Sequence, residues 1–148
     1  MAKMYVPLGI VFIIASYCFA QHQMYAETYD AGEKLYKKGE YSDAYGLFSQ
    51  VYIQSSDKDL RAKSIFMKAL CAYKLKRYSS AAQEFDEFIR LFPDNPLIHR
   101  AALWSADAHF SNESYSNSAQ NFALAMLSND PKIQRKANES LELSLIHI

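Results

Sequence analysis

The chain has 148 residues, of which 50% are hydrophobic and 14% are aromatic, and its 16 basic and 16 acidic residues cancel. This composition supports a folded core and excludes an intrinsically disordered chain. Neither sign of charge gathers in one segment, so the basic footprint of nucleic-acid-binding proteins is missing and no nucleic-acid partner is expected. Only four Gly and four Pro occur, which indicates long helices with short connections.

Residues 1–20 have the pattern of a secretory signal peptide. A positive charge at Lys3 is followed by an uncharged apolar run from Val6 to Ala20, and the polar residue Gln21 comes next. We predict removal of residues 1–20 by cleavage after Ala20, and therefore an exported protein. The apolar run is shorter than the roughly 20 residues that span a bilayer. An uncleaved membrane anchor is therefore the less favoured alternative.

Cys18 opens a second alternative, because bacterial lipoproteins carry a lipid on a cysteine at the cleavage point. Bulky Tyr17 stands where a small residue is wanted, and Ala15 stands where an aliphatic residue is expected. The pattern therefore favours cleavage after Ala20 over acylation. Once the leader is removed, Cys71 is the one remaining thiol and no internal disulfide can form. We interpret Cys71 as a buried, inert thiol.

A repeat follows the leader, because Tyr41, Tyr78 and Tyr115 succeed one another at intervals of 37 residues. Small and aromatic residues keep the same register before and after each tyrosine. Their spacings of three, four and seven place them on one helical face. We expect the following positions to hold the repeats together: Gly32, Tyr41, Ala44, Phe48, Ala69, Tyr78, Ala81, Phe85, Ala106, Tyr115 and Phe122.

Each unit is expected to be an antiparallel helix pair that buries its apolar face only by stacking on its neighbours. Polar residues and prolines at 56–59, 93–96 and 130–131 mark the links between the units. We predict repeats at about 24–58, 59–95 and 96–130 and a partial repeat at 131–142. The predicted helices are 24–38, 41–54, 59–75, 78–92, 96–111 and 115–129, with a seventh beginning near 131.

The strings KLYKKGEYSDAYGLF, CAYKLKRYSSAAQEF and AHFSNESYSNSAQNF share the order aromatic, turn, Tyr, small residue, aromatic. In this order the chain resembles the tetratricopeptide repeat (TPR) family over residues 24–142, although Lys76 and Glu113 replace the turn glycine found at Gly39. The resemblance implies an all-α, right-handed superhelix of about three and a half repeats. The segment FDEFIRLFPDNPLIHRAALWSADAHF is further similar to exported TPR proteins of Gram-negative envelopes, of the BamD-like and Tol–Pal-associated types.

The end of the sequence carries two expectations. Residues 131–142 begin a further helix, and no polar capping helix follows, so we expect the natural protein to continue. The closing string LSLIHI resembles a translated sequencing-adapter tail. Residues 143–148, including His147, are therefore not interpreted as native.

No catalytic, cofactor or metal site is predicted, and no small-molecule substrate is implied. The four histidines form no metal-ligand pair such as HExxH, and the chain has no GxSxG, Walker or Rossmann glycine pattern. Glu84, Asp86 and Glu87 lie close together in the sequence, and we interpret them as a solvated helix face, because catalytic carboxylates must converge in a cleft.

The TPR resemblance implies that the first helix of each pair lines a concave groove. Tyr36, Tyr73 and Phe110 recur in every unit, and we interpret them mainly as packing between repeats. Such a groove could take an extended peptide or a partner helix. The positions that match the family's groove, and that we predict to bind a partner, are Tyr29, Glu33, Lys37, Lys63, Phe66, Leu70, Lys74, Arg100, Leu103 and Asp107.

We therefore expect a non-catalytic protein–protein interaction scaffold of the bacterial cell envelope, in the periplasm or at the periplasmic face of the outer membrane. Its expected partners are other envelope proteins or peptides. One alternative is an N-terminal accessory module of a longer envelope enzyme or wall-binding protein. The other is a lipid-anchored component of outer-membrane protein assembly, which requires an acylated Cys18.

Overall fold

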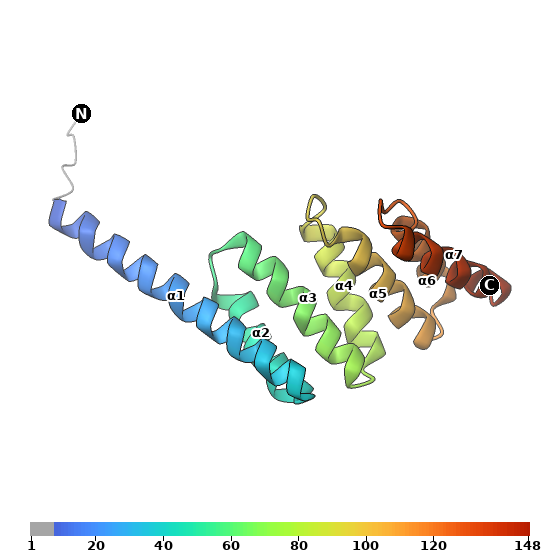
Figure 1. Cartoon of the computed structure of the whole chain (residues 1–148), viewed down its shortest axis with the longest axis horizontal. Helices are drawn as coiled ribbons and strands as arrows, with labels where there is room; N and C mark the ends of the chain where they lie inside the picture. Colours follow the sequence, from blue (N-terminus) through green and yellow to red (C-terminus); the bar gives the residue numbers. More distant parts are fainter. Residues whose placement is uncertain (1–7) are drawn as a thin grey trace.

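The structure, a computed structural model, describes residues 8–148 and contains seven α-helices in that range. They form an elongated all-α solenoid, with the start of α1 and the end of α7 at opposite ends (Figure 1). The part of the predicted signal peptide at residues 1–7 lies outside the described residues. The helices are α1 (Leu8–Lys38), α2 (Tyr41–Gln54), α3 (Lys58–Lys74), α4 (Tyr78–Leu91), α5 (Ile98–Ser111), α6 (Tyr115–Ala125) and α7 (Pro131–Ile146).

The all-α solenoid of helix pairs predicted from the repeat register is confirmed, and most helix ends agree within two residues. The largest difference is at α1, which begins at Leu8 and not near residue 24. No glycine or proline interrupts the sequence between Gly9 and Gly32, so the described part of the predicted leader continues from Leu8 into the first repeat as one helix. α6 ends earlier than predicted, at Ala125, because short i→i−3 hydrogen bonds tighten the chain there.

The links at 93–96 and 130–131 differ in how the following helix begins. Asp130 accepts a hydrogen bond from the Lys132 amide at 2.9 Å and Pro131 occupies the first turn of α7, so the residues of this link cap the helix that follows. Asn95 instead accepts from the Leu97 amide at 2.9 Å and closes a separate turn. α5 therefore begins at Ile98, after Pro96 and not at it.

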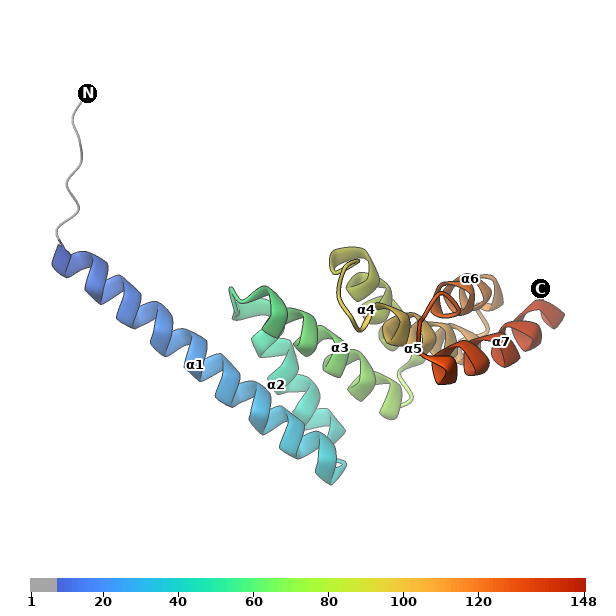
Figure 2. The same cartoon turned by 45° about the horizontal axis from the view of Figure 1, so that its top comes forward.

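The helices lie in two layers. Within the described range, α1, α3, α5 and α7 contact one another in succession, and each also packs against the second helix of its own pair or of the pair before it. Figure 2 shows this stacking from a second direction. The first helices of the pairs therefore form one continuous surface, on which the predicted groove residues lie.

The residues that recur every 37 positions form much of the buried core. Phe48, Phe85 and Phe122 occupy equivalent places and are 0%, 0% and 1% exposed, and the equivalent small residues are buried beside them. Across each turn inside a repeat, two aromatic rings meet edge to face, as in Tyr36–Tyr41 with ring centroids 5.3 Å apart. Tyr73–Tyr78 and Phe110–Tyr115 repeat that contact at 5.3 and 5.4 Å.

Tyr36, Tyr73 and Phe110 thus each contact an aromatic residue of their own repeat, across the turn. Tyr73 makes a further edge contact with Trp104 of the next repeat, at 5.1 Å. The predicted role in packing between repeats therefore describes only part of what these aromatic rings do.

The turn inside each repeat uses a left-handed residue. Gly39, Lys76 and Glu113 have φ angles of 85°, 59° and 60°, so the backbone keeps one conformation at all three turns. Only glycine adopts this conformation without steric cost. The two substitutions seen in the sequence strain the turn without changing its shape.

The first part of α1 projects beyond the solenoid (Figure 2). Its large apolar side chains from Ile10 to Phe19 are exposed, with Phe12, Ile13 and Phe19 between 68% and 70% exposed. Packing of α1 into the array begins at Tyr25, which is 9% exposed. Across residues 8–148, no helix is both long enough and apolar enough to cross a membrane.

At the other end, α7 continues through the segment that we predicted to be non-native. Ser144 is fully buried, and its hydroxyl lies 3.0 Å from that of Ser118. His147 packs against the rings of Phe110 and Tyr115. Residues 143–146 thus extend the helix, and their interpretation as a non-native tail stays a prediction.

Candidate binding groove

A groove of about 370 Å³ lies on the surface formed by α1, α3 and α5. Aromatic, aliphatic and basic side chains line it, and none of its lining residues is acidic. The lining residues are Tyr29, Tyr36, Lys63, Phe66, Met67, Leu70, Lys74, Leu97, Arg100 and Trp104. Six of the ten predicted partner-binding residues come together here.

The floor of the groove is part of the core. Phe66 is 4% exposed and packs edge to face against Phe85 and Phe88, at 5.6 and 5.8 Å between ring centroids. Leu70 is 8% exposed. These side chains are fixed before any partner arrives, so the apolar surface that they present is rigid.

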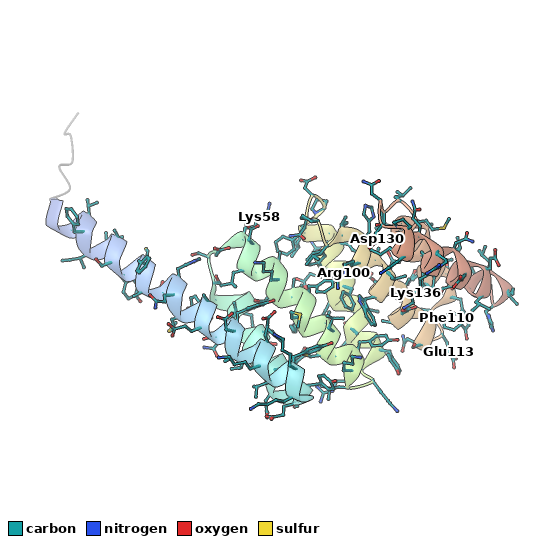
Figure 3. The ribbon with its side chains drawn as sticks, in the orientation of Figure 1. Lys58, Arg100, Phe110, Glu113, Asp130 and Lys136 are labelled. Carbon is teal, nitrogen blue, oxygen red and sulfur yellow. The ribbon has the colours of Figure 1, made fainter. Side chains whose placement is uncertain are left out.

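The rim of the groove is basic. Lys63, Lys74 and Arg100 are exposed, and none of them forms an ion pair with any carboxylate in the described range. The guanidinium carbon of Arg100 lies 5.8 Å from the centre of the Phe66 ring, a cation–π contact. Figure 3 shows Arg100 on α5. This contact holds one of the three charges over the apolar floor.

The other four predicted residues lie outside the groove lining. Glu33 accepts a hydrogen bond of 3.3 Å from the Tyr29 hydroxyl, and Lys37 is exposed near the end of α1. Burial, and then the neighbouring Glu33 carboxylate, raise the pKa of Tyr29 above its ordinary value. Leu103 belongs to the core cluster of α5, α6 and α7 and does not line the groove.

Asp107 lines a second pocket, of about 290 Å³, between α5 and α7. Its carboxylate pairs with Lys136 at 2.8 Å, and the Lys136 ammonium also lies 5.3 Å from the ring centre of Trp104. Tyr73 lines this second pocket, Trp104 lines the first, and their rings are in contact. The Tyr73–Trp104 pair therefore connects the two hollows.

Four further residues line the groove. One is Tyr36, which we interpreted mainly as packing between repeats, and sequence reasoning missed the other three: Met67, Leu97 and Trp104. Two of them had a usable signal, because Met67 and Trp104 each follow a predicted groove residue by four positions and share its helical face. Leu97 precedes its helix, so helical spacing could not have found it.

The interpretation of Glu84, Asp86 and Glu87 as a solvated face is wrong for Glu84 and incomplete for Asp86 and Glu87, which are partly exposed but bonded to neighbouring helices. Glu84 is 8% exposed, accepts a hydrogen bond of 2.6 Å from the Tyr45 hydroxyl and pairs with Lys68 at 3.0 Å. Glu87 accepts from the Tyr52 hydroxyl at 2.8 Å. Because α2 and α4 belong to neighbouring repeats, the hydrogen bonds of Glu84 and Glu87 connect the first repeat to the second.

Asp86 is the centre of a similar cluster between the second and third repeats. It accepts hydrogen bonds from Ser105 at 2.5 Å and Asn121 at 3.0 Å, and its other oxygen lies 2.8 Å from Nε2 of His109. Burial opposes ionisation of Asp86, but these hydrogen bonds outweigh it and lower the pKa of the carboxyl. Ser105 bonds to the carboxylate and not to His109, so the cluster contains no serine–histidine nucleophile pair.

Two further kinds of reactive group are the thiol of Cys71 and side chains that could bind a metal ion. Cys71 is 0% exposed, and burial followed by the charge of Glu84 raises its pKa to about 12, so the inert thiol predicted from the sequence is what the structure shows. Among residues 8–148, no three His, Cys, Asp or Glu side chains gather in a way that could hold a metal ion.

The family profile described as tetratricopeptide repeat matches residues 29–96 and 66–132. The chain therefore belongs to the tetratricopeptide repeat family. A search of curated protein sequences finds no significant match. The finer similarity to BamD-like or Tol–Pal-associated proteins stays a prediction.

Solved structures share the fold at low sequence identity. PcrH from Pseudomonas aeruginosa is 18% identical, with a TM-score of 0.72 over 83% of this chain and 92% of PcrH, and PcrH is also known in complex with the chaperone binding region of PopD. The Yersinia enterocolitica type III secretion chaperone SycD, in complex with a peptide of the translocator YopD, is 15% identical, with a TM-score of 0.71 over 84% and 94%. The TPR domain of P58(IPK) is 22% identical, with a TM-score of 0.70 over 87% of this chain and 35% of that one.

Proposed function

We propose that this protein is a non-catalytic interaction scaffold that holds a segment of a partner protein in the groove between α1, α3 and α5. The observation that carries the proposal is the groove itself. Its apolar floor is rigid, and the basic side chains on its rim form no ion pair with any carboxylate in the described range. Aromatic and arginine side chains in such a setting are the ones that contribute most to protein recognition.

The structural neighbours add support by analogy. PcrH and SycD share this fold, and their structures contain a segment of a partner protein, from PopD and YopD respectively. Binding of a peptide segment by proteins of this fold supports the same role for this chain.

Photo-crosslinking in cells tests the site without disturbing the core. We would replace Lys63 or Lys74, both exposed on the groove rim, with p-benzoylphenylalanine, and use Gln83 on the exposed face of α4 as the matched control position. We expect a crosslinked partner protein from positions 63 and 74 and none from position 83. Crosslinks from position 83 alone would contradict the proposal.

We further propose that the scaffold is exported and works in the bacterial cell envelope with envelope proteins as partners. The support is the order of charge, apolar run and small residue in residues 1–20. Mass spectrometry of the mature N-terminus is the test. Gln21 as the first residue agrees with export and cleavage, and a lipid on Cys18 favours the alternative of an anchored assembly component. An intact residue 1 contradicts both cleavage and acylation, and export would then require the uncleaved anchor.

The accessory-module alternative is tested separately. Sequencing the intact gene beyond Glu142 would show further repeats if the protein is a scaffold throughout. A catalytic or wall-binding domain there would favour the module of a longer envelope protein.

A further inference from the structure

The basic rim of the groove lacks a counter-charge in the described part of the chain. The protein as a whole has a net charge of zero, so three unpaired cations around one apolar hollow are not a consequence of a general positive excess. Exposed cations outside the groove, such as Lys58, Arg77 and Lys132, also form no ion pair in residues 8–148. What distinguishes Lys63, Lys74 and Arg100 is that they line one hollow together with apolar side chains and without any acidic residue.

The two acidic residues of the predicted partner-binding set are already engaged. Glu33 accepts a hydrogen bond from Tyr29, and Asp107 is paired with Lys136 at the edge of the second pocket. Figure 3 shows Arg100 and Lys136 on the neighbouring helices α5 and α7. An acidic ligand would therefore meet three cations whose charge no lining residue of the groove offsets.

The positions of the three cations fix the distance between the acidic groups of a ligand that could bind to them. α3 and α5 run in the same direction (Figure 1), with Lys63 and Arg100 near their N-terminal ends and Lys74 at the C-terminal end of α3. Eleven residues of helix separate Lys63 from Lys74, which is about 16 Å. An extended peptide covers that distance with about five residues. The apolar floor, with Phe66 and Leu70, lies between the two ends.

We infer that the groove selects an extended protein segment in which an apolar side chain lies between two acidic residues about five positions apart. This inference rests on the proposed function and adds the chemistry of the partner. The apolar side chain fills the hollow against Phe66, Met67 and Trp104, while Arg100 and Lys63 bind one carboxylate and Lys74 binds the other. A positively charged rim also accelerates the approach of an acidic segment, and added salt slows it.

Selection from a random dodecapeptide library, displayed on phage and panned against the full chain, is the first test. Enrichment of peptides that combine an apolar residue with two flanking acidic residues supports the inference. Enrichment of groove-binding peptides without acidic residues overturns the inference and leaves the proposed function intact. If no peptide is enriched, both are overturned.

Tryptophan fluorescence then measures the charge effect, because Trp104 is the single tryptophan of the chain and lines the groove. An enriched acidic peptide is compared with its counterpart in which Asp and Glu become Asn and Gln. We expect the amide peptide to bind at least about tenfold more weakly, and raised salt to reduce that difference. Equal affinity of the two peptides overturns the inference.

A matched pair of variants locates the effect. Lys63→Gln, Lys74→Gln and Arg100→Gln together should abolish the preference for the acidic peptide. Three exposed cations away from the groove provide a control with the same change in net charge, through Lys58→Gln, Arg77→Gln and Lys132→Gln. If the control variant loses the preference as fully as the groove variant, the preference is a property of net charge and the inference is overturned.

Discussion

Gly32 on α1 lies so close to Phe48 on α2 that a Cβ atom at position 32 would meet Cε1 of the Phe48 ring at 2.9 Å. Phe48 is fully buried, so its ring has no free space into which to move. The first helix pair can therefore approach to this distance only because position 32 has no side chain.

A methyl group at this position should destabilise the protein. We expect Gly32→Ala to lower the free energy of unfolding by about 1–3 kcal/mol, since the buried ring must shift. Gly46 is the matched control, because it lies in α2 with open space around it. There, Gly46→Ala should raise stability by about 0.5–1 kcal/mol through the loss of backbone freedom in the unfolded chain. Urea unfolding of the two variants measures both effects, and equal changes would refute the packing argument.

The strained turns predict stabilising substitutions. Lys76 and Glu113 hold the left-handed conformation that Gly39 adopts without cost. We expect Lys76→Gly and Glu113→Gly each to raise the free energy of unfolding by about 1 kcal/mol, because the steric cost of the side chain is removed. Gln83→Gly in the interior of α4 should instead lower it by about 1 kcal/mol. Thermal melts of the three variants should therefore shift in opposite directions.

The aromatic register predicts where the core is most sensitive. Phe85 is 0% exposed and packs against Phe66, so Phe85→Ala should cost about 3–5 kcal/mol. Lys63 is exposed at the groove rim, and Lys63→Ala should change stability by less than about 0.5 kcal/mol. A denaturant titration measures the free energy of unfolding of both variants. If Phe85→Ala lowers it as little as Lys63→Ala does, the 37-residue register is wrong.

The Asp86 cluster predicts a dependence of stability on pH. The pKa of Asp86 is lower in the folded chain than in the unfolded chain, so the stability that it contributes is present at neutral pH and is lost as the pH falls below the ordinary range of an Asp carboxyl and through the folded pKa. Asp86→Asn should remove about 1–3 kcal/mol at pH 7 and flatten this acid dependence. Asp94→Asn, in an exposed loop, is the control. Unfolding titrations between pH 3 and pH 7 that are parallel for wild type and Asp86→Asn would contradict the assignment.

The projecting start of α1 predicts that the leader is dispensable for folding. Residues 10–20 are exposed throughout, whereas Tyr25 and Tyr29 pack into the array, with Tyr29 and Phe48 ring centroids 5.3 Å apart. Deletion of residues 1–20 should leave the melting temperature of the array unchanged. Deletion of residues 1–30 should lower it, because both tyrosines are lost. Circular dichroism melts compare the two truncations, and a large loss of stability in the shorter one would refute the prediction.

The sequence by itself determined the repeat and therefore most of the fold. A tyrosine every 37 residues, followed by buried Phe48, Phe85 and Phe122, fixes which face of each helix is apolar, because helical periodicity is a local property. The same register located the left-handed turn residues at Lys76 and Glu113. The resemblance to the TPR family implied six of the groove residues, because the first helix of each pair lines the groove in that family.

Only the tertiary structure decided how the units meet. Asp86 is joined to Ser105, His109 and Asn121 from two other helices, and Glu84 to Tyr45 and Lys68, contacts that no spacing along a single helix contains. The composition of the groove was settled in the same way, because Leu97, Arg100 and Tyr29 become neighbours only when three helix pairs stack. Side chains that are distant in the sequence meet through packing between repeats, and the charge left unpaired on the rim of the groove is visible only once those contacts are known.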